Sequence, residues 1–124
     1  MKNVVVTGAS KGIGLAIAKK FAAEGYNVAI CARHEKYLDE AVEMIKSTSK
    51  SDSKIFSFVC DVSQADERIA FAEFVKGNLG EVDILVNNAG IFIPGQVHNE
   101  DDGVLEIMLQ TNVQSAYHFS RLFL

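Results

Sequence analysis

The sequence predicts an α/β fold in which a doubly wound parallel sheet is covered by helices on both faces. Short apolar, β-branched runs alternate with longer segments of helical period, as in repeated strand–helix–strand units. The strand candidates are almost entirely apolar, as expected for strands buried on both faces. The 124 residues are 48% hydrophobic and 23% charged, which is typical of one soluble globular domain. The predicted order is β-α-β-α-β-α-β-α.

The first half of the chain contains two predicted strands, each followed by a helix. The strands are Asn3 to Thr7 and Asn27 to Ala32. The helix after the first strand carries apolar residues on one face, and these are Ile13, Ala16, Ile17 and Phe21. After the second strand, apolar residues recur at i, i+3, i+4 and i+7, which predicts an amphipathic helix. These residues are Leu38, Ala41, Val42 and Ile45, and they leave Glu35, Lys36 and Glu43 outside.

The second half repeats this alternation after a polar connection at residues 47–53. Its predicted strands are Lys54 to Cys60 and Asp83 to Asn87. Ser63, followed three residues later by Asp66, predicts the N-cap of a helix. The apolar stripe of that helix is Phe71, Phe74, Val75 and Leu79. Residues 91–103 contain the only proline and predict a long loop, and residues 104–124 predict a helix that is apolar on more than one side.

Charge and composition exclude several classes of function. The formal net charge is −4 and no Lys/Arg-rich run is present, so we expect neither nucleic-acid nor acidic-membrane binding. The apolar runs are too short to span a bilayer and no export signal is visible, so we expect a cytoplasmic protein with small-molecule partners. Cys31 and Cys60 lie within or at the ends of apolar runs, which predicts buried thiols. The histidines, His34, His98 and His118, show no ligand spacing, and we expect no metal site.

A glycine-rich turn, Thr7-Gly8-Ala9-Ser10-Lys11-Gly12-Ile13-Gly14, directly follows the first strand and opens a helix. Glycine permits a tight turn and a close approach of the backbone to a phosphate. The first amides of the helix are unpaired and lie at the positive end of its dipole, so they suit a pyrophosphate. The alternative is that the glycines only form the turn. No Gly-Lys-Ser/Thr closes the turn, so it is not a P-loop, and we predict a Rossmann-type dinucleotide-binding fold.

The residue that directly follows the second predicted strand predicts which dinucleotide is bound. In such folds this position carries an acid for NAD or an arginine for NADP, and here it is Arg33. Lys11 adds a second positive charge that could reach the same 2′-phosphate. We therefore predict NADP(H) as the cofactor. The alternative is that Arg33 forms a solvated pair with Glu35, which would contribute little energy.

The glycines at 8, 12 and 14 resemble the turn of the short-chain dehydrogenase/reductase family. The resemblance extends over nearly the whole chain, because further motifs follow in the same order and spacing as in the family. Among family members, the chain resembles those that are similar to 3-oxoacyl-[acyl-carrier-protein] reductase. These motifs are Asp61-Val62, Asn87-Asn88-Ala89-Gly90 and Asn112. The turn, the two cations and the resemblance together predict one cofactor-binding set, which is Gly8, Ser10, Lys11, Gly12, Ile13, Gly14, Arg33, Asp61, Val62, Asn88, Ala89 and Gly90.

The resemblance also implies roles for individual residues. Asp61 would accept a hydrogen bond from the adenine amino group with help from the Val62 backbone, and residues 88–90 would border the adenosine ribose. Asn112 would shape the active-site helix and take part in a proton relay through water, as the one active-site member of this chain. Two alternatives stay open: Asp61 could begin a helix-capping turn, and Asn112 could satisfy a backbone group. Gly80 and Asp83 also resemble the family, and we expect them to be structural.

Family members carry a catalytic serine and a tyrosine followed four positions later by a lysine. No Tyr-x-x-x-Lys is present, since Tyr26 precedes Ile30, Tyr37 precedes Ala41 and Tyr117 precedes Arg121 by four positions. We therefore expect residues 1–124 to be the NADP(H)-binding portion of a single domain, truncated after the fourth strand and its following helix. The C-terminal catalytic portion would be absent, and these residues alone would be inactive.

The resemblance implies that the complete protein transfers hydride between NADPH and a ketone or 3-oxoacyl carbonyl, so its substrate is a small carbonyl or alcohol. A non-catalytic dinucleotide-binding or interaction module is the main alternative, because such a module would also lack the tyrosine and lysine. A flavodoxin-like domain is a third reading of the same alternation. A truncated sheet edge and an exposed apolar helix invite association, so we also expect a homo-oligomer or further chain over these surfaces.

Overall fold

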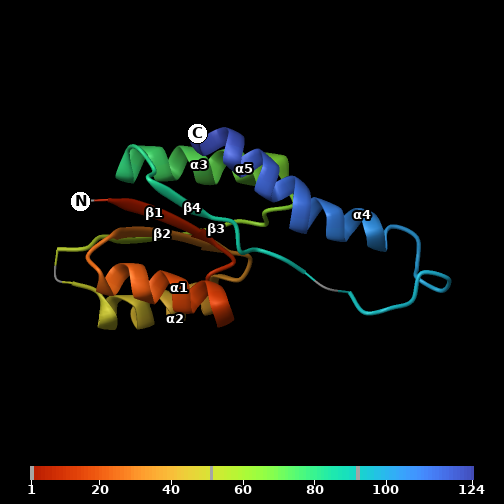
Figure 1. Ribbon diagram of the computed structural model, residues 1–124, viewed down its shortest axis with the longest axis horizontal. Coiled ribbons are helices and arrows are strands. Elements are labelled where there is room, and N and C mark those ends of the chain that lie inside the picture. Colours follow the sequence, from red (N-terminus) through yellow and green to blue (C-terminus); the bar gives the residue numbers. More distant parts are fainter. Residues whose placement is uncertain (1, 51, 92) are drawn as a thin grey trace.

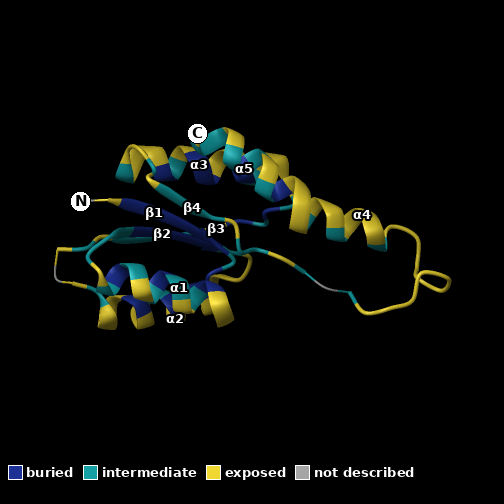
Figure 2. Ribbon diagram, in the orientation of Figure 1, coloured by how far each residue is buried: buried dark blue, intermediate teal, exposed yellow. Residues whose placement is uncertain are grey.

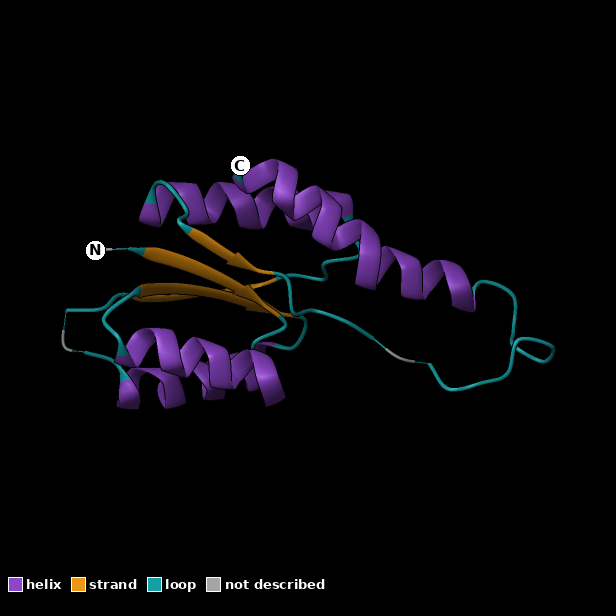
Figure 3. Ribbon diagram, in the orientation of Figure 1, coloured by secondary structure: helices purple, strands orange, loops and turns teal. Residues whose placement is uncertain are grey.

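The computed structural model describes residues 2–50, 52–91 and 93–124, and it confirms the predicted α/β fold (Figures 1 and 3). Its elements are β1 (Asn3–Thr7), α1 (Gly12–Ala23), β2 (Asn27–Ala32), α2 (Glu35–Thr48), β3 (Ile55–Val59), α3 (Ala65–Leu79), β4 (Ile84–Val86), α4 (Val104–Leu109), η1 (Gln110–Gln114) and α5 (Ser115–Phe123). The order is the predicted one. Strands β3 and β4 are one residue shorter at each end than predicted.

The four strands form one parallel sheet in the order β3-β2-β1-β4. Val5 of β1 pairs with Ala29 of β2 on one side and with Leu85 of β4 on the other. Helices α1 and α2 cover one face, and α3 and α5 cover the other (Figure 1). Because the chain leaves β1 toward β2 and later returns to the other side of β1 as β4, the winding reverses between β1 and β4. In open α/β sheets, ligands bind outside the carboxyl ends of the strands at such a reversal.

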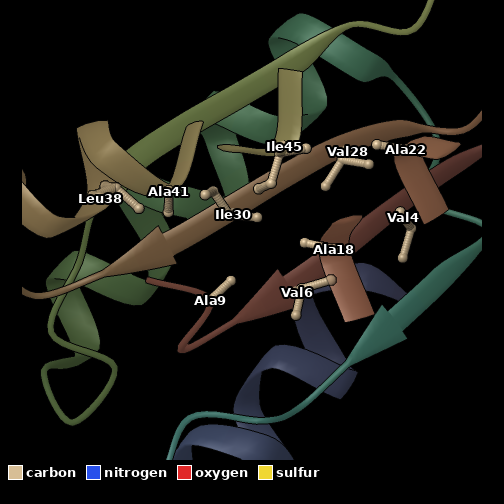
Figure 4. Close-up of a cluster of buried hydrophobic side chains, with 10 residues drawn as sticks. All are labelled: Val4, Val6, Ala9, Ala18, Ala22, Val28, Ile30, Leu38, Ala41 and Ile45. Atoms are coloured by element: carbon tan, nitrogen blue, oxygen red, sulfur yellow. The ribbon is translucent and has the colours of Figure 1, made fainter. Parts of the chain in front are cut away.

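The core under α1 and α2 is built around small residues of α1 (Figure 4). The buried positions of α1 are Gly14, Ala18 and Ala22, spaced by four residues. The predicted apolar face is therefore partly wrong, because Ile13 is 74% exposed and Ala16 is also exposed. Small side chains on the buried face allow the helix backbone to come close to the sheet, and the residues beside them are left outside.

The core on the other face packs aromatic side chains of α3 and α5 together. The rings of Phe71 and Phe119 lie 5.9 Å apart in an edge-to-face arrangement. Cys31 and Cys60 are free and buried here, as predicted. The predicted N-cap at Ser63 is wrong, because α3 begins at Ala65 after Gln64 and has no side-chain cap. Ser63 instead takes part in the loop that follows β3.

The amino ends of the strands are held together by the Asn3 side chain. Its amide nitrogen donates to the carbonyls of Leu79 and Glu81 at 2.9 and 2.8 Å. Its amide oxygen accepts from Asn27 at 3.0 Å, and the Asn3 backbone N–H donates to Asp83 at 2.8 Å. Asp83 therefore has the structural role that we expected. The strands are therefore held together at their amino ends, and at their carboxyl ends the chain continues into loops.

The last helical segment, α4-η1-α5, runs on from the body of the molecule, and α4 carries mostly exposed residues (Figure 2). Along the whole segment α4-η1-α5, the exposed apolar side chains include Leu105, Leu109, Val113 and Tyr117. β4 lies at the edge of the sheet. The predicted exposure of apolar helix surface is therefore present. No helix within the described residues is long and apolar enough to cross a membrane.

Candidate dinucleotide-binding site

The turn after β1 requires glycine for two different reasons. Gly8 and Gly12 have φ angles of 63° and 61°, in the left-handed region that side chains disfavour. A Cβ on Gly8 would also lie 2.7 Å from the Ala89 Cα. Gly14 has an ordinary φ, but a Cβ there would lie 2.5 Å from the Gly8 carbonyl oxygen. The turn is therefore folded tightly against both α1 and the segment after β4.

The N-terminus of α1 is open. Its N-cap residue, Lys11, is extended and makes no side-chain capping bond, and the first turn contains no acid. The first backbone N–H groups of α1 therefore lack a side-chain acceptor within the described residues. Such an end attracts anions through its free N–H groups and the helix dipole.

Thr7 joins this turn to the end of β4. Thr7 is 1% exposed, and its hydroxyl accepts from the backbone N–H groups of Asn88 and Ala89 at 3.1 and 3.0 Å. The side-chain amide of Asn88 donates through Nδ2 to the Gly8 carbonyl at 3.0 Å. Sequence reasoning missed Thr7, although a hydroxyl that ends an apolar strand just before a glycine turn is a readable signal. The predicted groups Gly8–Gly14 and Asn88–Gly90 are thus brought together.

The two predicted phosphate-binding cations lie at adjacent strand ends. The Ala9 N–H donates to the Cys31 carbonyl at 3.3 Å, which holds the glycine turn beside the end of β2, where Arg33 follows. Lys11 and Arg33 are both exposed. Within ranges 2–50, 52–91 and 93–124, no carboxylate lies within 4.0 Å of either cation, so the alternative pair of Arg33 with Glu35 is not formed.

The loop after β3 presents Asp61 at the same edge of the sheet. The Cys60 N–H donates to the Ala32 carbonyl at 2.9 Å, which places this loop beside the end of β2. Asp61 Oδ1 accepts from the Ser63 N–H at 3.0 Å and from its hydroxyl at 2.7 Å. The Asp61 N–H donates to Glu67 at 2.9 Å. Asp61 therefore shapes a turn before α3, as one alternative proposed, and Oδ2 accepts no bond from the described residues.

Asn112 lies in η1, a single π-helical turn inside the last helical segment. Its Oδ1 accepts from the Ile91 N–H at 2.7 Å, and its Nδ2 donates to the Ile91 carbonyl at 2.8 Å. The amide therefore satisfies both backbone groups of one loop residue, as the alternative reading of Asn112 proposed. Isolated π turns occur often at functional sites, and this one attaches the last helical segment to the loop after Gly90.

Two thiols lie beneath the edge formed by these loops. A hydrogen bond with Cys60, followed by burial, raises the pKa of Cys31 well above its ordinary value. Cys31 is therefore a neutral packing residue at neutral pH. In the described part of the chain, no group of three His, Cys, Asp or Glu residues could hold a metal ion.

The predicted residues lie at the carboxyl ends of the four strands, in the segments that follow them. The glycine turn follows β1, Arg33 follows β2, Asp61-Val62 follows β3 and Asn88–Gly90 follows β4. Asn112 reaches the same edge through its bonds to Ile91. A surface hollow of about 590 Å³ lies elsewhere, between the C-terminal ends of α3 and α5, and none of the predicted residues lines it.

Comparison with known proteins identifies relatives along the whole chain. The profile of the short chain dehydrogenase family matches residues 2–124. Dehydrogenase/reductase SDR family member 4 of Caenorhabditis elegans is 34% identical over 122 residues, which cover 98% of this chain and 46% of that protein. Senescence-associated protein 13 of Arabidopsis thaliana is 37% identical over 123 residues, which cover 97% and 44% of the two chains.

A solved structure shows the same arrangement of the backbone. L-sorbose reductase from Gluconobacter frateurii, complexed with NADPH and L-sorbose, matches with a TM-score of 0.92 and 33% identity. The match covers 98% of this chain and 46% of the reductase. The chain thus spans less than half the length of each of these relatives.

Proposed function

The chain belongs to the short-chain dehydrogenase family, and from this premise we propose that residues 1–124 are the NADP(H)-binding portion of an oxidoreductase. One observation carries the proposal: the glycine turn and the segment after β4 are hydrogen-bonded together at the reversal between β1 and β4. An open α/β sheet binds ligands at this place, and a glycine turn that opens a helix suits a pyrophosphate.

The residues present fit the phosphates of a dinucleotide. At Gly8 and Gly14 a Cβ would clash with neighbouring backbone, and the free N–H groups of α1 lie directly after the turn. We propose that the turn, including Ser10 and Ile13, binds the pyrophosphate side of the cofactor. Lys11 and Arg33, which form no ion pair among the described residues, would bind the 2′-phosphate.

The remaining assignments concern the adenosine and the active site. Asp61 and Val62 would bind the adenine, and Asn88, Ala89 and Gly90 would border the ribose. Asn112 would hold the active-site helix to the loop after β4 through its two bonds to Ile91. Its proposed share in a proton relay is a role in the whole protein.

The bound cofactor would supply a hydride to a small carbonyl compound or accept one from an alcohol. We propose a ketone or 3-oxoacyl group as the substrate class of the whole protein. These 124 residues contain no Tyr-x-x-x-Lys, so we propose that they bind cofactor and are inactive alone. The exposed apolar surface of α4 supports association with further copies of the chain. The two buried cysteines form no disulfide, which suits a reducing compartment such as the cytoplasm.

The experiment that tests the cofactor assignment is a calorimetric titration with NADPH and NADH. We expect Arg33→Asp to weaken NADPH binding by about ten- to a hundredfold, because a charge-assisted bond to phosphate contributes roughly 1.5–3 kcal/mol. NADH binding should not weaken. Lys46→Asp is the matched control, because it makes the same charge change on the exposed last turn of α2. An unchanged NADPH/NADH ratio in Arg33→Asp contradicts the assignment.

A further inference from the structure

Arg68 is buried where an apolar residue would be expected. It is 6% exposed, whereas its neighbour Ile69 is 50% exposed. The buried positions of α3 are Arg68, Phe71, Ala72 and Val75, spaced at i, i+3, i+4 and i+7. Arg68 therefore occupies the first position of the stripe that packs against the sheet. Burying a guanidinium costs free energy unless a specific partner compensates.

The partner of Arg68 is a backbone group of the loop after β3. Its Nη1 donates to the Val62 carbonyl oxygen at 2.8 Å. No carboxylate lies within 4.0 Å of Arg68 in the part of the chain that the structure describes. The buried charge is thus directed at the loop rather than at an acid. A hydrogen bond from a charged donor is stronger than one between neutral groups.

The preceding residue of α3 holds the other side of the same segment. Glu67 Oε1 accepts from the Asp61 N–H at 2.9 Å. Consecutive side chains of one helical turn therefore fix the N–H of Asp61 and the carbonyl of Val62, which flank the peptide bond between these two residues. Asp61 Oδ1 is occupied by Ser63, so the carboxylate has one oxygen without a partner among the described residues.

We propose that Arg68, together with Glu67, is a positioning residue that sets selectivity for the adenine base by holding Asp61 and Val62 in one orientation. The inference rests on the proposed binding of NADP(H). A fixed carboxylate oxygen can accept a hydrogen bond from the 6-amino group of adenine. A base with a 6-oxo group has an acceptor instead of a donor at this position, so its oxygen would face the carboxylate oxygen without a hydrogen bond and the base should bind less tightly.

The test compares calorimetric titrations of the protein with NADPH and with its deamino analogue, in which the adenine is replaced by hypoxanthine. We expect the wild-type protein to prefer NADPH by about tenfold or more, the value of one charged hydrogen bond. In Arg68→Met this preference should fall to within about twofold, while the affinity for the deamino analogue stays the same. Lys76→Met is the control, because it removes a positive charge from the exposed last turn of α3.

The outcomes separate this inference from the function on which it rests. If Arg68→Met weakens both cofactors equally, or keeps the preference, the positioning role is refuted. If Arg68→Met does not fold, Glu67→Ala decides, because it removes the acceptor of the Asp61 N–H at a partly exposed position: a reduced preference supports the positioning role, and a wild-type preference overturns it. A wild-type protein that binds NADPH without preference refutes this inference alone. One that does not bind NADPH refutes the proposed function as well.

Discussion

Thr7→Val removes one hydroxyl group and tests whether the end of β1 organises the candidate site. Valine has nearly the same shape as threonine, so the packing around this buried position is preserved. The backbone N–H groups of Asn88 and Ala89, however, lose their common acceptor. Each unsatisfied, part-buried donor costs about 1–2 kcal/mol, so we expect the free energy of unfolding to fall by about 2–4 kcal/mol. Because both donors lie in the segment after β4, NADPH affinity should fall too.

Urea denaturation followed by circular dichroism measures this change. Thr7→Ser is the matched control, because it keeps the acceptor oxygen and removes a buried methyl group, at a cost of about 1 kcal/mol. The valine variant should therefore be the less stable of the two, although it preserves more apolar contact. If Thr7→Val unfolds at the same urea concentration as wild type, or if Thr7→Ser is the weaker variant, the bonds of the Thr7 hydroxyl do not hold the two loops together.

Two other properties follow from the same structure. Gly14→Ala should destabilise the protein by about 3 kcal/mol, because its Cβ would meet the backbone of the turn. Gly77→Ala is the control, since a Cβ at this helical position has nothing within 4 Å, and it should stabilise the protein by about 0.5–1 kcal/mol. Thermal unfolding of both variants measures the two changes, and equal effects would contradict this reasoning. The raised pKa of Cys31 contributes stability that is present below the unfolded-state value of about 8.5 and is lost as pH rises above it. Urea titrations between pH 7.5 and 9.5 should show a steeper decline for wild type than for Cys31→Ala, and parallel declines would show that this thiol ionises alike in both states.

Much of the fold could be predicted because its signals are local. Apolar runs and helical periods depend only on neighbouring residues, and the glycine turn combines a strand end and a helix start within eight positions. The differences at the ends of β3 are small, because Lys54 and Cys60 still form backbone bonds with β2 outside the regular pairing. The parallel pairing of the strands followed from the rule that parallel strands need helical crossovers, but this rule does not give the strand order β3-β2-β1-β4.

The parts that could not be predicted depend on contacts between distant residues. The position of Thr7 before the glycine turn is a local signal, but its partners are not, because they lie 81 and 82 positions away in the sequence. The predicted face of α1 was right for Ile17 and Phe21, which pack against the core, and wrong at its start because hydrophobicity alone favours Ile13 over Gly14. Close approach to the sheet instead selects the smallest residue. Arg68 was missed for the converse reason, since a charged side chain in an apolar stripe is ordinarily placed at the surface.

The candidate site is maintained by side chains that bond to loop backbone rather than by regular secondary structure. Thr7 fixes the segment after β4, Arg68 the loop after β3, and Asn112 the residue that follows Gly90. Each uses a side chain on a rigid strand or helix to satisfy polar groups that no neighbouring strand or helix could pair. Polar groups of the same loops that have no partner among the described residues, such as Asp61 Oδ2, are thereby held in a fixed orientation. Substitutions at these holding positions should therefore alter cofactor selectivity even though the holding side chains need not touch the cofactor.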